Sequence, residues 1–173
     1  MTDWQKLGER RLYDGYRRII GRTYRLPDGT EFEFEVKLEP PSAVVVALTA
    51  ADEIVLVREF RPGLEASLLE LPGGVVDDGE EPLEAARREL LEETGYAGEL
   101  AYAGTTLDCG YSTRRRHVFV CRGSRRVVDP SPGPGEAPEV VLVSLEEFRE
   151  HLRGGRLTDV GPGYVGLDRL GLL

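Results

Sequence analysis

Three glutamates, Glu89, Glu92 and Glu93, stand at helical spacings of i, i+3 and i+4. The segment 82–94 that carries them is expected to be a helix, because proline stands at its start and glycine follows its end. Its apolar stripe consists of Leu83, Ala86 and Leu90. At 100° per residue the three carboxylates lie along one arc beside that stripe, where like charges repel one another. A bound divalent cation would offset this repulsion, and oxygen ligands suit Mg²⁺ or Mn²⁺. Taken alone, such a helix is also compatible with a solvated acidic face.

The residues around this helix favour the cation. Gly73 and Gly74 precede it and allow backbone carbonyls to approach a ligand closely. Glu80 lies just before the helix, within reach of Arg88. A purely acidic surface or a metal-buffering protein would not need these neighbours.

The complete spacing resembles the box of the Nudix hydrolases, G-x5-E-x7-R-E-U-x-E-E-x-G-U, with U a bulky apolar residue. All seven fixed positions are present: Gly74, Glu80, Arg88, Glu89, Glu92, Glu93 and Gly95. Leu90 fits U, and Tyr96 is aromatic where an aliphatic residue is usual. The resemblance implies an enzyme that hydrolyses the pyrophosphate bond of a nucleoside diphosphate linked to another group X. Such a reaction needs charge neutralisation and alignment more than covalent help, which metal ions can supply.

The resemblance also implies roles for individual residues. The expected metal ligands are the carbonyl of Gly73 and the side chains of Glu89, Glu92 and Glu93. The expected catalytic residues are Glu89, Glu92, Arg88 and Glu80, with Arg88 orienting Glu89 and Glu80 holding Arg88. Mg²⁺ is the expected cofactor, and Mn²⁺ is an alternative.

Beyond the box lie Val57-Arg58-Glu59-Phe60-Arg61-Pro62, then Leu71-Pro72-Gly73-Gly74, and the late strand His117-Val118-Phe119-Val120. This layout resembles the ADP-ribose and nucleoside-diphosphate-sugar pyrophosphatase branch. The expected substrate-binding residues are Arg58, Arg61, Arg114 and Arg116, because guanidinium groups match phosphate oxygens. For each, pairing with a nearby carboxylate is the alternative. The branch usually carries a loop Ser-Pro-Gly followed by a glutamate that acts as base, whereas Cys109 replaces the proline and Arg114 replaces the glutamate here. The base is therefore expected to be Glu89 or Glu92, or another loop residue such as Glu136. Other Nudix substrates (a dinucleoside polyphosphate, FAD or NADH) and a nucleotide-sensing module without turnover stay open.

The hydropathy pattern predicts an α+β fold that can hold this helix. Expected strands cover 23–26, 31–38, 43–48, 53–59, 68–71, 100–105, 117–121 and 139–143, a loop covers 127–137, and further helices cover 144–152 and 164–170. We expect a Nudix-type α/β/α sandwich with a mixed sheet over 41–173, preceded by a small antiparallel β unit over 1–40. In the resembled branch such a unit is exchanged across a homodimer and helps to form the nucleoside pocket. Its aromatic candidates for base stacking are Trp4, Tyr13, Tyr16 and Tyr24.

Composition excludes several classes of protein. The 173 residues include 22 lysines and arginines against 31 aspartates and glutamates, which gives a net charge of −9 and disfavours non-specific nucleic-acid binding. Two cysteines are too few for a disulfide framework or a four-cysteine zinc site. No apolar stretch is long enough to span a membrane and no signal peptide is visible, so we expect a cytoplasmic protein whose partner is a small nucleoside diphosphate derivative.

Overall fold

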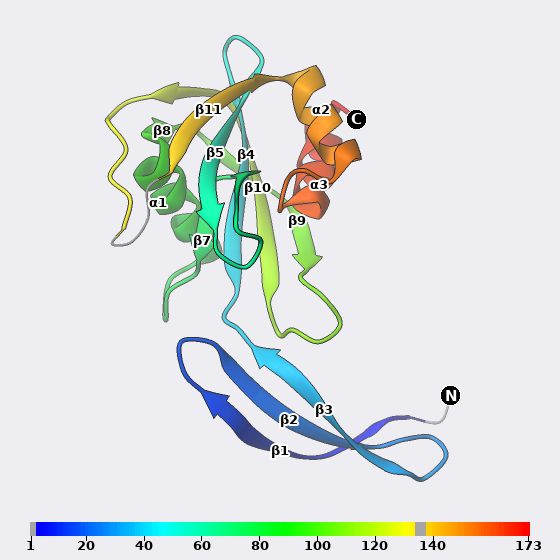
Figure 1. Cartoon of the computed structure of the whole chain (residues 1–173). Coiled ribbons are helices and arrows are strands. Elements are labelled where there is room, and N and C mark those ends of the chain that lie inside the picture. The colour runs from blue at the N-terminus through cyan, green and yellow to red at the C-terminus, as the bar shows by residue number, and fades with distance from the viewer. Residues whose placement is uncertain (1–2, 134–137) are drawn as a thin grey trace. The chain divides into compact units, whose positions relative to one another are not determined.

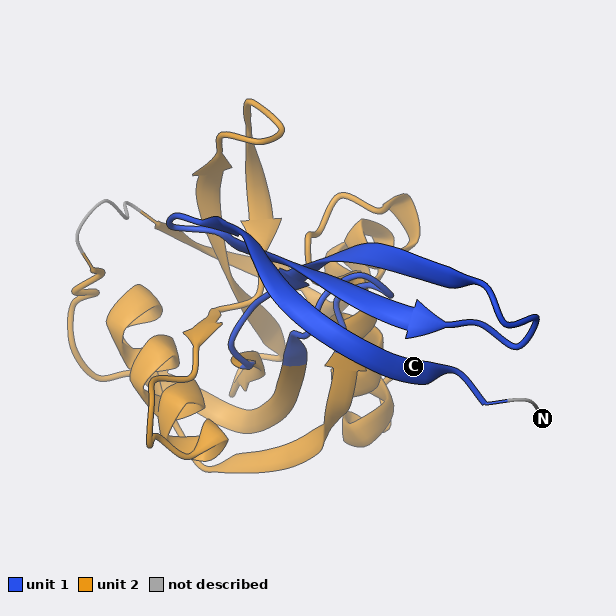
Figure 2. Cartoon of the chain, turned by 90° about the horizontal axis from the view of Figure 1, so that it is seen from below, with its two compact units in different colours: residues 1–41, 107–115 blue, residues 42–106, 116–173 orange. Residues whose placement is uncertain are grey.

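The structure is a computed structural model that describes residues 3–133 and 138–173. It divides into two compact units (Figure 2). The first unit comprises Met1–Pro41 and Leu107–Arg115, and the second comprises Ser42–Thr106 and Arg116–Leu173.

The first unit is built on a three-stranded antiparallel sheet in the order β1-β2-β3. Its strands are β1 (Gln5–Asp14), β2 (Arg18–Arg25) and β3 (Glu31–Leu38). The expected antiparallel β unit is thereby confirmed, although the sequence pattern did not reveal β1. Half of the residues of that strand are charged, and ion pairs to the other strands hold it: Arg10 bonds Glu33 at 2.6 Å and Arg22 bonds Glu9 at 2.9 Å.

Over its described residues, the second unit contains an eight-stranded mixed sheet and three helices, which Figure 1 labels. Its strands are β4 (Ser42–Thr49), β5 (Glu53–Arg61), β6 (Ala66–Glu70), β7 (Gly73–Val75), β8 (Tyr96–Ala97), β9 (Leu100–Leu107), β10 (Arg115–Arg126) and β11 (Glu139–Ser144). Its helices are α1 (Pro82–Thr94), α2 (Leu145–Gly154) and α3 (Val160–Leu170). The path β11-β5-β4-β10-β8 runs through the sheet, and β10 pairs with β4 in parallel whereas β5 pairs with β4 antiparallel.

Helices cover both faces of this sheet, as the expected sandwich requires (Figure 1). Strand β4 is buried over its whole length. Its successive side chains point to opposite faces of the sheet, and helices cover both faces. Val44, Val46 and Leu48 pack in the cluster that contains Phe148 of α2 and Leu167 of α3. The alternate residues Ala43, Val45 and Ala47 pack in the cluster that contains Ala86 and Leu90 of α1. A continuous apolar run is therefore the sequence signature of a strand covered on both sides.

Some local differences from the sequence prediction have simple causes. Helix α3 begins at Val160, about one turn before the expected start near Tyr164, since Gly161, Pro162 and Gly163 weaken the helical pattern there. The short strands β7 and β8 carry too few residues to show a periodicity. The expected loop 127–137 lies partly outside the described residues. Within the described part of the chain, no helix is long and apolar enough to cross a membrane.

Candidate active site

Helix α1 forms over the residues that the sequence pattern predicts. Pro82 occupies its first turn, and Gly95 ends it with φ 72° while donating its N–H to the carbonyl of Leu91 at 2.8 Å. An N-terminal proline and a left-handed glycine are the usual ends of a helix. The buried face consists of Ala85, Ala86, Leu90, Glu93 and Thr94. The acidic residue Glu93 is thus buried with the apolar face, whereas Glu89 and Glu92 are half-buried beside it.

Arg88 lies at the centre of the charged cluster on α1. Its Nε and Nη2 each donate to a different oxygen of Glu80 at 3.0 Å, and its Nη1 donates to Glu89 at 2.7 Å and to Glu92 at 3.4 Å. Nη2 also donates to the carbonyl of Val75 at 3.1 Å, which attaches the helix to β7. Hydrogen bonds from Arg88 lower the pKa of Glu80, and the Glu80 and Glu89 carboxylates raise the pKa of Arg88. One guanidinium therefore offsets the repulsion among three carboxylates.

Glu93 joins α1 to the first residue of β7. Its carboxylate accepts the backbone N–H of Gly73 at 2.9 Å, and the carbonyl of Pro72 accepts the N–H of Val45 in β4 at 2.9 Å. A Cβ on Gly73 would lie 2.8 Å from the Cα of Val44 and also collide with the Ala43 carbonyl, so only glycine allows β7 to lie this close to β4. The packing thereby fixes the Gly73 backbone beside the acidic edge of α1.

Gly74 faces the carboxylate of Glu89. A Cβ at position 74 would lie 2.5 Å from the Glu89 carboxyl carbon, which is far inside van der Waals contact. The missing side chain leaves the space that the Glu89 carboxylate occupies. The two adjacent glycines thus have different neighbours, since Gly73 packs against the backbone of β4 and Gly74 packs against the carboxylate of Glu89.

The residues present suit a hard divalent cation in the chemistry of their donors. Glu89, Glu92 and Glu93 offer carboxylate oxygens along one edge of α1, next to the Gly73–Gly74 backbone. Among residues 3–133 and 138–173, no three acidic, histidine or cysteine side chains already form a cage that would hold a metal. Glu89 and Glu92 instead turn toward Arg88. Binding a cation would therefore exchange part of the Arg88 pairing for metal coordination.

The two candidate arginines of β5 lie on opposite faces of the sheet. Residues 55, 57, 59 and 61 share the face covered by α1, because Val55 packs with the α1 core cluster. Arg61 is on this face: its Nε donates to Glu70 at 2.5 Å, its Nη2 reaches the second Glu70 oxygen, and Glu59 lies 3.0 Å from Nη2. The pKa of Arg61 is raised, first by the Glu70 bond and also by the charges of Glu59 and Glu93, so Arg61 lies within electrostatic reach of the acidic edge of α1.

Arg58 is on the other face of β5 and contacts Glu139 at a looser 3.8 Å. The structure therefore brings Arg61, and not Arg58, to the α1 side of the sheet.

The candidates Arg114 and Arg116 belong to different units. In the first unit Arg114 lies 3.7 Å from Glu39, and its buried Nε finds no hydrogen-bond partner in the described part of the chain. In the second unit Arg116 bonds the buried carboxylate of Asp159. Burial is the main cause that raises the pKa of Asp159, and Arg116 opposes it.

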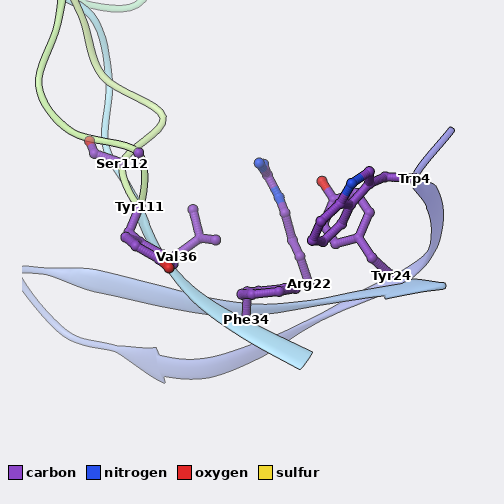
Figure 3. Close-up of a pocket in the computed structure, with 8 residues that line it drawn as sticks. Trp4, Arg22, Tyr24, Phe34, Val36, Tyr111 and Ser112 are labelled. Carbon is purple, nitrogen blue, oxygen red and sulfur yellow. The ribbon is translucent and has the colours of Figure 1, made fainter. Parts of the chain in front are cut away.

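The first unit has its own hollow, lined by aromatic side chains (Figure 3). Its volume is about 350 Å³, and it is lined by Trp4, Arg22, Tyr24, Phe34, Val36, Gly110, Tyr111 and Ser112. The register places Arg22 opposite Phe34, and Tyr24 follows Arg22 on the same face of β2. The rings of Trp4 and Phe34 lie 5.8 Å apart, and Trp4 is 54% exposed. This hollow falls in the size range of small-molecule sites.

Comparison with known proteins agrees with the box and the fold. Residues 39–159 match the NUDIX domain, and the chain belongs to the Nudix family. It is 30% identical over 140 residues to the methanol dehydrogenase activator of Bacillus methanolicus, covering 78% of this chain and 74% of the relative. It is 31% identical over 147 residues to the ADP-ribose pyrophosphatase of Bacillus subtilis, covering 81% and 77%. A crystal structure of an ADP compounds hydrolase superposes with a TM-score of 0.79 at 19% identity, over 99% of this chain and 97% of that one. The expected family and fold class are confirmed.

Sequence reasoning missed several residues of these sites. Glu70 and Asp159 carry no local motif, and their partners Arg61 and Arg116 are 9 and 43 residues away. Phe34 was expected only as part of an alternating strand. Glu136, an alternative base, lies outside the described residues.

Proposed function

We propose that this protein hydrolyses the pyrophosphate bond of a nucleoside diphosphate linked to X, with ADP-ribose or a nucleotide sugar as substrate. The observation that carries the proposal is the cluster of Glu80, Arg88, Glu89, Glu92 and Glu93 beside the Gly73–Gly74 backbone. Family membership and the similarity to a relative named ADP-ribose pyrophosphatase support the same reaction. Water attacks one phosphorus, and the leaving phosphate departs with its new negative charge.

Mg²⁺ is the proposed cofactor, with Mn²⁺ as the alternative. The carboxylates of Glu89, Glu92 and Glu93 and the carbonyl of Gly73 would hold it. When bound, such an ion neutralises phosphoryl oxygens and makes water a better nucleophile near neutral pH. Arg88 orients Glu89 and Glu92 from one side, and the paired Glu80 fixes Arg88 in turn. Glu89 or Glu92 is the proposed general base, and Glu136 is the alternative.

Arg61 is the proposed phosphate-binding residue of the second unit. Its Nε and Nη2 are engaged by carboxylates, but Nη1 has no hydrogen bond or ion pair with the described residues. A free guanidinium edge on the α1 face suits a phosphate oxygen. Arg58 is a weaker candidate because it lies on the face of β5 that α1 does not cover, and Arg116 is a weaker one because it bonds the buried carboxylate of Asp159. The buried, unpartnered Nε of Arg114 supports a role in anion binding within the first unit.

The first unit is proposed to bind the nucleoside and to mediate a homodimer. The aromatic hollow offers flat apolar surface for a base, with Trp4 and Tyr24 among its walls (Figure 3). Tyr13 and Tyr16, the other stacking candidates, are exposed and do not line it. The boundary after residue 40 and a cytoplasmic location stay predictions from the sequence.

The direct test incubates the purified chain with ADP-ribose and Mg²⁺. We expect release of AMP and ribose 5-phosphate, loss of activity when EDTA is added, and recovery with Mg²⁺ or Mn²⁺. A parallel panel of GDP-mannose, UDP-glucose, FAD, NADH, diadenosine tetraphosphate and GTP identifies the preferred X. Binding of ADP-ribose without turnover of any compound would instead indicate a nucleotide-sensing module and refute the proposed hydrolysis.

A further inference from the structure

Glu70 is a buried acid that none of the motifs explains. It is the last residue of β6, directly before the Leu71-Pro72-Gly73 segment, and only 6% of its surface is exposed. A buried carboxylate is costly unless it is paired and hydrogen-bonded. Its partner is Arg61, through two roughly parallel bonds to Nε and Nη2. The pair therefore has the bidentate geometry that fixes a guanidinium in one plane.

The pair is asymmetric in its exposure. The side chain of Glu70 is 8% exposed, whereas that of Arg61 is 43% exposed. Glu70 thus holds the guanidinium from its buried side, and Nη1 has no hydrogen bond with the described residues. Strand pairing sets this geometry. Glu70 of β6 lies opposite Val57 of β5, so its side chain is on the same sheet face as Glu59 and Arg61.

We propose that Glu70 is a positioning residue that aims the guanidinium of Arg61 at the diphosphate of the substrate; this inference rests on the proposed function. An arginine at a strand end has several rotatable bonds, and ordering it when substrate arrives costs entropy. Because Glu70 already fixes the guanidinium in the free protein, this entropy is not lost when the substrate binds. Arg58, whose one ion pair among the described residues is with the exposed Glu139 at 3.8 Å, lacks this support.

The charge count supports positioning rather than simple neutralisation. Glu59 already lies 3.0 Å from Nη2, so one carboxylate would be enough to balance the guanidinium. Glu70 adds a second negative charge in a buried place close to a third acid, since its charge also raises the pKa of Asp159. What Glu70 contributes beyond charge is the two-point contact with the fork.

A double-mutant cycle tests the proposal. The variants are Glu70→Gln, Arg61→Lys and the double variant, assayed for ADP-ribose hydrolysis with titrated Mg²⁺. Glu70→Gln preserves the shape but places an amide NH₂ against an arginine N–H, which breaks the fork. Arg61→Lys keeps the positive charge and removes the fork. The matched control is Glu84→Gln, which breaks the exposed 2.6 Å pair of Glu84 with Arg87 on α1.

Glu70→Gln is expected to raise KM about tenfold, to leave the Mg²⁺ concentration for half-activation unchanged, and to add less than twofold in the Arg61→Lys background. Glu84→Gln is expected to match the wild type. An equal loss in both backgrounds, or a shift in the Mg²⁺ requirement, would overturn the proposal, because Glu70 would then act on folding or on the metal site. If Glu70→Gln is unfolded at the assay temperature, Glu70→Asp, which keeps the charge but shortens the reach, replaces it in the same cycle. A wild-type chain inactive on the whole substrate panel would refute the proposed function itself, an outcome separate from the cycle.

Discussion

Replacing Gly74 by alanine is expected to lower the rate of hydrolysis while leaving the stability of the fold nearly unchanged. The new Cβ would lie 2.2 Å from Oε1 of Glu89, and ordinary contact begins at 3.4 Å, so the carboxylate must move by about 1.2 Å. A displacement of this size in a catalytic group costs roughly 100-fold in rate. The Glu89 carboxylate also accepts the 2.7 Å bond from Arg88, so the same substitution disturbs the guanidinium that organises the cluster.

The stability of Gly74→Ala is expected to stay close to that of the wild type. The carboxylate is the end of a flexible side chain and can swing away, at the cost of a partly buried ion pair with Arg88 worth about 1 kcal/mol, the upper end for exposed pairs. Alanine in a strand reduces the freedom of the unfolded chain, which offsets this loss by about 0.4–1 kcal/mol. Gly73→Ala differs, because its Cβ would strike the backbone of Ala43 and Val44, and we expect it to lower the melting temperature.

The assay measures kcat, KM and the Mg²⁺ requirement with ADP-ribose, and thermal unfolding by circular dichroism. Gly8→Ala is the neutral control, because a Cβ there meets nothing within 4 Å. Gly74→Ala with wild-type kcat/KM would refute the assignment of Glu89 to the catalytic cluster. A large fall in its melting temperature would show that the space beside Gly74 serves packing rather than catalysis.

Three further changes test other parts of the second unit. Glu93→Gln is expected to fold normally, since its amide oxygen can still accept the backbone N–H, but to lose nearly all turnover at saturating Mg²⁺; wild-type turnover would contradict its proposed role as a ligand. Asp159→Asn removes the buried carboxylate that Arg116 bonds, and it is expected to lower the free energy of unfolding by about 3–5 kcal/mol in urea titrations. An unchanged urea midpoint would show that the pair does not contribute to stability. The hydrogen bonds from Arg88 lower the pKa of Glu80 in the folded protein below the ordinary value of 4.5. Ionised Glu80 therefore stabilises the fold above pH 4.5, and this stabilisation is lost as the pH falls through the lowered pKa of the folded state. Melting curves from pH 6 to 3 should therefore show a steeper acid loss for the wild type than for Glu80→Gln, and parallel curves would contradict the pairing.

The sequence pattern correctly predicted the elements whose formation depends on residues close to one another in the chain. Helix α1 begins at Pro82 and ends before Gly95 as expected, because its caps and apolar stripe all lie within one segment. Helix α2 likewise begins at a local signal, because a capping box joins Ser144 and Glu147, three residues apart. Strand β1 was missed because its stability depends on ion pairs with Arg22 of the adjacent β2 and Glu33 of β3, at the far side of β2, rather than on its own hydropathy.

The sequence by itself determined the family and the acidic edge of α1, because helical spacing alone brings Glu89, Glu92 and Glu93 together. Only the tertiary structure decided which arginine of β5 lies on the α1 face and which acids hold it. The distinction between Arg61 and Arg58 depends on which sheet face α1 covers, and the partner Glu70 is set by the antiparallel register of β6. These contacts join separate strands, and their pairing follows from sheet order and core packing, which no local pattern in the chain records.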